Sequence, residues 1–429
     1  MFVKKDTKWL VILILVAFVA GLIVTRAIAA DDLRSYQHGV DLVPRGDGQY
    51  WLIWSSSGNP PRGQWTHDIY RALINPTCPS ITPQTLISRS GAQEQSSADV
   101  SADGKIMVVT EDDWNVSNLV ATRYGVYNAS DLSGVKPYPQ MTYDGGHSAH
   151  VSAVGNRFVV WYGDEWCDGG GVDNLGSGRD LKVAVYDSSG NLERHEYIQG
   201  PGNCNIAAQR NWWPIVAGSS DRAFLLWQRF VSSSASYAKL MYQVYNPVDG
   251  SLMPASPVQI EGAVEFYTYD VQYYPSIDRF LVVGTYNSGG GFAYLFDNNG
   301  TIVAQNTALP AIPREVQPAE RAFSDGVKVV YPRSPNGALV LWVTGSSISL
   351  DQTISDSYNW SYIGTDGIFL NDTQAYFVSG SASGLVQKTF FLSSVMANKI
   401  YLPYLSCIVR TPPNQRLQPT AFGAGMRVP

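Results

Sequence analysis

The sequence predicts a repetitive fold built almost entirely of β-strands. Three observations predict it: the composition, the short alternating apolar runs that follow residue 33, and the recurrence of one strand-and-turn pattern. Of the 429 residues, 45% are hydrophobic and 15% are charged, which indicates a globular chain with ample core. The 12 Trp, 25 Tyr and 39 Gly favour many short strands separated by turns.

One segment recurs six times along the chain. It is a turn containing Gly, Asp or Asn, followed by an apolar strand that usually ends near Trp, as in GDGQYWLIW at 46–54 and VGNRFVVW at 154–161. A fixed period of this size is typical of repeats that stack to bury a shared core. The six strands end at Trp54, Thr110, Trp161, Trp227, Gly284 and Trp342.

A second series of turns lies downstream of these strands. Five of the turns begin with an acid or amide side chain, as tight turns between antiparallel strands require, and the sixth copy, YIGTDGIF at 362–369, is degenerate. The turns begin at Asn75, Asn128, Asp187, Asn246 and Asp297. Each unit of about 57 residues therefore contains four strands.

Four-stranded units repeated six times predict a six-bladed β-propeller. Residues 375–394 form one further hairpin pattern, so a seven-bladed propeller with an incomplete last blade is the alternative. A tandem of β-sandwiches is a second alternative, although a sandwich usually needs about 100 residues. We expect the propeller domain to span residues 36–394, followed by a short strand segment at 395–410 and a disordered tail at 411–429.

The N-terminus has the pattern of an export signal. Lysines precede an unbroken apolar run from Trp9 to Val24, and a small-x-small site ends at Ala29. Sixteen residues are few for a membrane-spanning helix. We therefore expect residues 1–29 to be a cleaved signal peptide, with an uncleaved membrane anchor as the alternative, and the mature protein to be secreted or held at the cell surface.

Charge and cysteine usage limit the partners. The net charge is −6 and no Lys/Arg cluster occurs, which disfavours nucleic acid and anionic membranes as partners. An oxidising compartment permits disulfides. Cys167 and Cys204 fall on the same face of adjacent blades, and we expect them to pair. We expect the mature chain to act as a monomer.

At the level of architecture, the chain resembles the secreted bacterial β-propeller families. The Ser-x-Asp-x-Gly-x-Thr-Trp turns of sialidases are absent, and the nearest stretch, at 101–104, lacks the Thr-Trp half. The signatures of WD and kelch repeats are absent as well. The resemblance therefore implies the architecture but no activity.

The loops that join the second and third strands of each unit are long and unequal, and they select the face that we expect to bind a ligand. Indole rings stack on sugar rings, so Trp-lined loops suit a glycan, although large aromatic side chains also serve as packing plugs. The candidate ligand-binding residues are Trp65, Trp114, Trp166 and Trp212.

Carboxylates lie beside these tryptophans. Two of them facing each other could act as general acid and nucleophile in glycoside hydrolysis, or they could form a solvated acidic rim. The candidates are Asp112, Asp113, Asp164 and Glu165. The Gly-rich loop at 168–180 supplies Asp168, Asp173 and Asp180 as weak ligands for calcium. We otherwise expect no cofactor.

These observations favour an extracellular protein that binds a glycan or another protein on this loop face. A glycoside hydrolase or lyase is the first alternative, and a structural or adhesion module is the second. No GxSxG, HExxH, Walker or dinucleotide motif supports another chemistry.

Overall fold

The computed structural model describes residues 37–57, 67–112, 121–143, 146–163, 180–200, 205–232, 234–360, 364–381 and 384–393. Apart from a single 3-10 turn at Ala207–Gln209, every element in these ranges is a β-strand. No helix in this part of the chain is long and apolar enough to span a membrane. The predicted signal peptide, C-terminal strand segment and tail lie outside the described residues.

The first three sheets each contain four antiparallel strands that are consecutive in the chain. The first sheet contains β1 (Gln37–Pro44), β2 (Tyr50–Ser56), β3 (Asp68–Ile74) and β4 (Gln84–Ile87). The second contains β5 (Glu94–Val100), β6 (Lys105–Asp112), β7 (Ala121–Asn128) and β8 (Gly134–Met141). The third contains β9 (His147–Val154), β10 (Arg157–Gly163), β11 (Leu181–Asp187) and β12 (Leu192–Gln199).

The next sheet has seven strands, and two smaller sheets follow it. The large sheet contains β13 (Asn211–Gly218), β14 (Ala223–Phe230), β15 (Tyr237–Tyr245), β16 (Leu252–Tyr274), β17 (Arg279–Tyr286), β18 (Gly291–Phe296) and β19 (Ile302–Leu309). A four-stranded sheet contains β20 (Ala319–Phe323), β21 (Gly326–Pro332), β22 (Asn336–Thr344) and β23 (Ser347–Asn359). The last contains β24 (Thr365–Asn371), β25 (Gln374–Ser381) and β26 (Gly384–Phe391).

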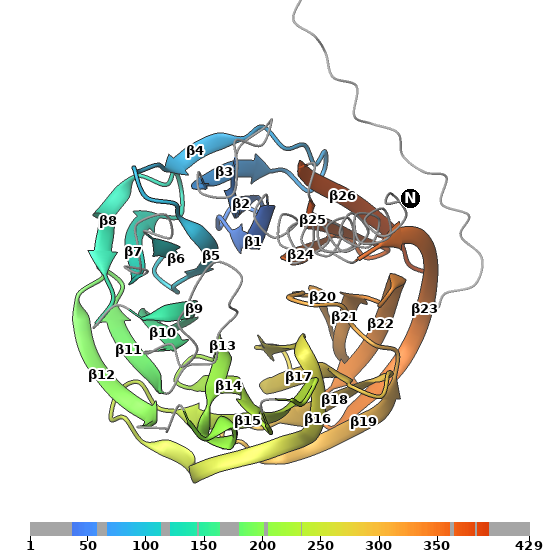
Figure 1. Cartoon of the computed structure of the whole chain (residues 1–429). Helices are drawn as coiled ribbons and strands as arrows, with labels where there is room; N and C mark the ends of the chain where they lie inside the picture. The colour runs from blue at the N-terminus through green and yellow to red at the C-terminus, as the bar shows by residue number, and fades with distance from the viewer. Residues whose placement is uncertain are drawn as a thin grey trace, which may run out of the picture. The chain divides into compact units, whose positions relative to one another are not determined.

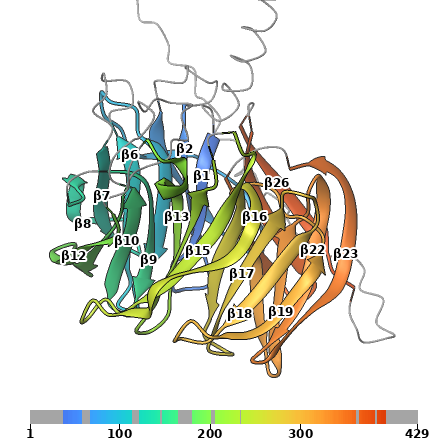
Figure 2. The same ribbon diagram turned by 60° about the horizontal axis from the view of Figure 1, so that its bottom comes forward.

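The seven-stranded sheet is two blades joined by one long strand. The first part of β16 pairs with β15, and its last part, from Tyr269 to Tyr274, pairs with β17. The outermost strand of the fourth blade therefore continues directly into the innermost strand of the fifth (Figure 2). Counted this way, the described residues form seven blades, six of four strands and a last one of three.

The blades follow one another around a central axis in chain order. The first strand of each blade lies nearest the axis, and the last lies at the periphery (Figure 1). The middle strands are almost wholly buried, whereas outer strands such as β8 and β12 alternate between exposed and partly buried residues. This gradient follows from the architecture, because the middle strands are covered by sheets on both faces.

The hydrophobic core lies between the blades. Each of the seven buried clusters found in the described part of the chain contains residues of two consecutive blades. Strand β10 shows how one strand serves two clusters. Phe158 and Val160 pack toward the second blade, whereas Val159 and Trp161 pack toward the fourth. Because successive side chains of a strand point to opposite faces, both sets must be apolar.

The ring closes between the last blade and the first. Ile368, Tyr376 and Val378 of the last blade form one cluster with residues of β1, β2 and β3, including Leu52 and Trp54. All strands of the last sheet come from consecutive chain positions, so no described strand of the first blade pairs into it. Among the described residues, side-chain contacts rather than a shared sheet join the last blade to the first.

The prediction of an all-β propeller is confirmed. The arrangement corresponds to the seven-bladed alternative, with residues 365–391 as its incomplete last blade. The difference from six blades arises at the sixth repeat. Trp342 lies on β22, the third strand of its blade, whereas Trp54, Trp161 and Trp227 lie on second strands. The degenerate copy at 362–369 contributes the first strand of the last blade.

Close approach of neighbouring innermost strands leads to a stability prediction. A Cβ atom on Gly218 would lie 1.9 Å from the backbone oxygen of Ala153 in the preceding blade. We expect Gly218→Ala to lower the free energy of unfolding by at least about 2 kcal/mol, because the two strands must separate. Gly134→Ala is the control, since a Cβ there meets nothing within 4 Å. Equal urea midpoints for the two variants would contradict the prediction.

Candidate functional site

The innermost strands of the seven blades enclose a channel along the axis. Its volume is about 660 Å³, which lies within the usual range of small-molecule sites. The lining includes Gln95 and Gly364 near one end of these strands and Pro44 and Phe369 near the other. The channel therefore follows the whole length of the innermost strands.

A left-handed residue occurs near the start of every innermost strand. Its φ angle lies between 45° and 79°, a conformation that costs energy for any residue other than glycine. In β1, β5, β13 and β16 the strand pairing shifts register at this point, as at a β-bulge. The seven residues are Gly39, Gln95, Ser148, Trp213, Tyr267, Glu315 and Gly364.

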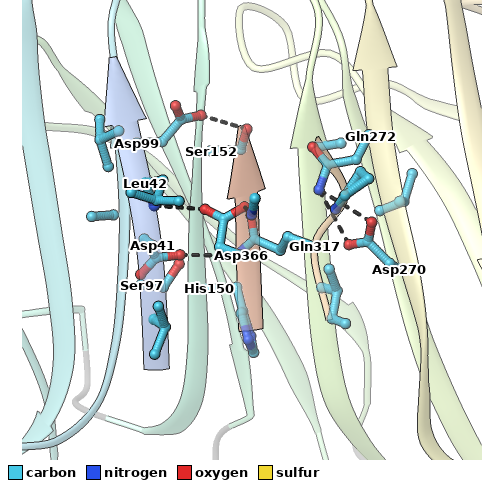
Figure 3. A pocket seen from close by; sticks show the side chains of 18 of the residues that line it. Asp41, Leu42, Ser97, Asp99, His150, Ser152, Asp270, Gln272, Gln317 and Asp366 are labelled. Atoms are coloured by element: carbon cyan, nitrogen blue, oxygen red, sulfur yellow. Dashed lines mark hydrogen bonds between the residues drawn. The ribbon is translucent and has the colours of Figure 1, made fainter. Parts of the chain in front are cut away.

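In each blade, the residue two positions after the left-handed residue occupies an equivalent place in the channel. We call these seven residues the channel ring. Six of its seven members can form hydrogen bonds. Figure 3 shows how those of the first, sixth and last blades lie close together. The channel ring consists of Asp41, Ser97, His150, Ile215, Tyr269, Gln317 and Asp366.

Asp366 and Ser97 of the channel ring accept hydrogen bonds from backbone N–H groups of the next blade. Asp366 Oδ2 accepts a hydrogen bond of 2.6 Å from the N–H of Leu42 in the first blade. Ser97 Oγ accepts one of 3.2 Å from the N–H of Val151 in the third blade. The Asp366 bond joins the last blade to the first, so this carboxyl group helps to close the ring.

The same kind of contact recurs two residues deeper. Asp99 Oδ2 accepts hydrogen bonds from the Ala153 N–H at 2.8 Å and from the Ser152 hydroxyl at 2.9 Å. Ser152 Oγ in turn accepts a bond of 2.9 Å from the N–H of Gly218. Innermost strands cannot all pair as one sheet, and these polar side chains satisfy backbone groups that would otherwise be buried without partners.

Asp41 has a different environment. The side-chain amide of Gln317 donates a hydrogen bond of 2.9 Å to Asp41 Oδ1 across the channel. The residue is only 6% exposed, and the backbone of Ala98 in the second blade makes a further favourable contact with its carboxyl group. Asp41 therefore contacts both the second and the sixth blade.

Burial raises the pKa of several carboxyl groups in the channel. It raises the pKa of Asp41 to about 8, with a further contribution from the charge of Asp99, against the favourable contacts of Gln317 and the Ala98 backbone. It raises the pKa of Asp270 to about 7, although Tyr331 and Gln272 donate hydrogen bonds to that group. The pKa values of Asp99 and Asp366 are raised for the same reason.

His150 is the basic member of the channel ring. Burial lowers its pKa to about 4, so the imidazole is neutral at pH 7. Its ring lies edge-on to Trp213 at a centroid distance of 5.6 Å. A neutral imidazole can donate and accept hydrogen bonds but contributes no positive charge to the channel.

Asp112 is the catalytic candidate that the structure describes, and it lies in a structural ion network. Its side chain is fully buried and accepts hydrogen bonds from Arg89, from Tyr138 at 2.8 Å and from Gln93 at 2.8 Å. Arg123 Nε lies 3.5 Å from the same carboxylate. These contacts hold the connection between the first two blades, which carries Arg89 and Gln93, against strands β7 and β8.

Trp212 and Asp180 are buried as well. Trp212 is 1% exposed and stacks on Phe230 at 3.7 Å, which agrees with the alternative that this indole is a packing plug. Asp180 is 1% exposed, and the described residues contain no group of three potential metal ligands. The remaining candidates lie outside the described residues: Trp65, Asp113, Trp114, Asp164, Glu165, Trp166, Cys167, Asp168, Asp173 and Cys204.

The channel carboxyls are not among the sequence-based candidates, all of which were sought in loops or connections. A signal for them exists in the sequence. Asp41 and Asp270 are single acids in otherwise apolar or neutral stretches of first strands, VDLVP at 40–44 and YDVQ at 269–272. A charged residue in a strand that should be buried marks either a structural contact or a site.

No protein-family model matches the chain, and no characterised protein matches it in sequence. Solved structures match in fold. The BP39L lectin from Burkholderia pseudomallei is 13% identical, with a TM-score of 0.51 over 84% of this chain and 96% of its own.

Two further propellers are similar over much of their length. The propeller domain of the Trilobed protease from Pyrococcus furiosus is 10% identical, with a TM-score of 0.44 over 85% of this chain and 99% of its own. The six-bladed lectin of Aleuria aurantia is 12% identical, with a TM-score of 0.39 over 68% of this chain and 90% of its own. At 13% identity, the likeness to the BP39L lectin shows a shared fold and nothing beyond it.

The network around Asp112 leads to a second stability prediction. Asp112→Ala would leave Arg89 and Arg123 without their shared anion, so we expect a loss of about 3–5 kcal/mol. Asp47→Ala is the control, because that carboxylate is exposed and lies 3.6 Å from Arg45; its loss should cost less than about 1 kcal/mol. Urea unfolding measures both values. A small effect for Asp112→Ala would show that the network contributes little.

The raised pKa of Asp41 leads to a prediction about pH. Asp41 holds its proton in the folded state up to about pH 8, whereas the unfolded state releases it near pH 4. The folded state therefore binds more protons between these values, and the free energy of unfolding falls as pH rises. His150 acts in the opposite sense below pH 6.5.

We thus expect stability to decrease between pH 6.5 and 8 by up to about 1.4 kcal/mol per pH unit from Asp41 alone. Asp41→Asn should reduce this slope. Asp47→Asn, which changes an exposed aspartate instead, should have the same slope as the parent protein. Thermal unfolding at four pH values measures the slope. A slope that is identical in all three proteins would place the ionisation of Asp41 outside this window.

Proposed function

We propose that this chain is an extracellular binding protein that takes a carbohydrate into the end of its central channel, on the face of the loops joining second and third strands. The observation that carries this proposal is the channel ring. It places hydrogen-bonding side chains of several blades around one cavity of about 660 Å³. Sugar hydroxyls both donate and accept hydrogen bonds, so they suit a wall that mixes carboxyl, amide, hydroxyl and imidazole groups.

The chemistry of the wall favours a polar ligand over an apolar one. Two of the aromatic side chains that line the channel are engaged in packing or hydrogen bonding: Trp213 is buried, and the Tyr269 hydroxyl donates to the Trp213 backbone oxygen. Asp41 and Gln317 instead present polar atoms to the space between them. A ligand that replaces water here must reproduce its hydrogen bonds, as a polyhydroxylated molecule can.

The loop tryptophans extend this proposal. Trp65, Trp114 and Trp166 belong to loops that leave the second strands of the first three blades. Stacking of sugar rings on these indoles would supply the apolar contacts that the channel wall lacks. In the proposed arrangement the channel ring hydrogen-bonds one sugar unit, and the loops contact the units that follow it.

Binding is favoured over hydrolysis by the common direction in which burial shifts the pKa values of the channel carboxyls. A glycosidase needs one protonated and one ionised carboxyl group, with environments that separate their pKa values. Here burial raises the pKa of Asp41, Asp99, Asp270 and Asp366 together. The four environments shift these pKa values in the same direction and do not separate them as glycoside hydrolysis requires.

A glycan array followed by calorimetry tests the proposal. We expect the mature chain to bind a subset of glycans and Gln317→Leu to weaken that binding about tenfold or more, because a hydrogen bond to the ligand and the support of Asp41 are both lost. Gln140→Leu, on the outermost strand β8, is the matched control and should bind normally. Retention of full affinity by Gln317→Leu would remove the channel from the binding site. Release of reducing sugar would instead support the hydrolase.

A further inference from the structure

Three arginines lie at the end of the blades where the left-handed residues of the innermost strands are found. Arg229 pairs with Asn211, the first residue of β13, and Arg210 directly precedes that strand. Arg314 directly precedes Glu315, the left-handed residue of the sixth blade. The three arginines adjoin the fourth, fifth and sixth blades, which follow one another around the axis (Figure 1). We call them the arginine arc.

The guanidinium group of Arg229 is half-buried, and its hydrogen-bond partners among the described residues are neutral. Its Nε donates a hydrogen bond of 3.0 Å to Asn211 Oδ1, and its Nη2 donates to Gln199 Oε1. A guanidinium has five N–H donors, so these two bonds leave most of them without an acceptor in the part of the chain that the structure describes. Burial lowers the pKa of Arg229, and no carboxylate acts against that shift.

The contacts of Arg229 do not by themselves explain its charge. Other arginines of the described ranges lie beside a carboxylate, as Arg157 Nε lies 2.6 Å from Glu193. A joint between the third and fourth blades needs only hydrogen bonds, which an uncharged side chain can also supply to Gln199. A partly buried cation among neutral groups is costly, and an anionic partner would stabilise it most.

Aromatic rings hold the other two members of the arginine arc. The guanidinium carbon of Arg314 lies 6.0 Å from the ring centroid of Tyr267, and that of Arg210 lies 6.0 Å from the ring centroid of Phe230. A ring face attracts a cation without neutralising its charge. Arg314 is exposed and forms no ion pair with any described residue, although Glu315 follows it in the chain. The charge of Arg314 is therefore held near the channel and faces solvent.

We propose that the ligand is an acidic oligosaccharide whose carboxylate or sulfate groups bind the arginine arc, with one of these groups on Arg229. This inference rests on the proposed function and specifies its ligand class. A guanidinium presents paired N–H donors that match the oxygens of an anionic group. An oligosaccharide carries such groups at intervals along its length, which suits arginines that come from separate blades. The hydroxyl groups of one sugar unit remain available to the channel ring.

The experiment measures the binding of matched probes to the mature chain by calorimetry at pH 7. The first pair is tetragalacturonate and its methyl ester, which keeps the sugar chain but lacks the charges. The second pair is sulfated and unsulfated cellotetraose. We expect the charged member of at least one pair to bind at least about tenfold more tightly at low salt, and this preference to shrink as salt is added. The pair that shows the preference identifies the anionic group.

Three variants place the anion. Arg229→Gln keeps a side-chain amide donor but removes the charge, and it should reduce the preference at least about threefold. Arg314→Gln changes an exposed residue and should reduce it as well, so the test remains valid if the loss of the Arg229 hydrogen bonds prevents folding. Arg157→Gln is the matched control. It removes the same charge from the opposite end of the blades, beside Glu193, and should keep the preference.

The outcomes separate this inference from the proposed function. Equal affinity for charged and uncharged members of both pairs would overturn the acidic ligand and leave glycan binding intact. A preference that falls no further in Arg229→Gln and Arg314→Gln than in Arg157→Gln would overturn the placement on the arginine arc. Failure of all glycans, neutral and anionic, to bind would overturn the proposed function itself. Thermal unfolding profiles like that of the parent protein verify that each variant is folded.

Discussion

The fold depends on one constraint: each blade must bury apolar side chains on both of its faces. A single twisted sheet has no means of covering itself, so each blade depends on the two beside it. In β10, Phe158 faces one neighbour and Trp161 the other. A row of such sheets would leave its two end faces exposed to water, and closure into a ring removes both ends. The cluster that joins Trp54 to Tyr376 is therefore as necessary as the clusters within the series.

Closure has consequences at the axis. The innermost strands approach one another closely enough that Gly218 has no room for a Cβ atom, yet they cannot pair as a continuous sheet. Backbone N–H groups are consequently left facing neighbouring blades. Asp366, Ser97, Asp99 and Ser152 accept hydrogen bonds from these groups. The polar interior of the channel is thus a requirement of the architecture before it is a feature of any site.

The same residues carry the chemistry that a ligand would meet. A carboxyl group that is buried to bind a backbone N–H acquires a raised pKa, because water no longer stabilises its charge. Asp366 has a complete structural role at the junction of the first and last blades. Asp41, at the equivalent position one blade further on, is contacted by the side-chain amide of Gln317 and by the Ala98 backbone. The residues that hold the blades together therefore also form the wall that a ligand would meet.

The fold could be predicted in large part from the sequence, and the site could not. The turns and buried strands that end at Trp54, Trp161 and Trp227 follow a local pattern of alternating and turn-forming residues, so their period reveals blades without knowledge of their contacts. The predicted number of blades was wrong at Trp342, because a Trp can lie on a second or a third strand with the same local sequence. The burial of Trp212 and the ion network of Asp112 depend on neighbours distant in the chain.

The sequence by itself determined the strands, the turns and the repeat, because each arises from residues within a few positions of one another. Only the tertiary structure decided the number of blades and the location of the candidate site. Asp41 and Gln317 are separated by most of the chain and meet because the ring closes between them. The burial of the Asp41 carboxyl group is likewise a product of that closure, since burial and hydrogen bonding are set by the blades that surround a residue and not by its own strand.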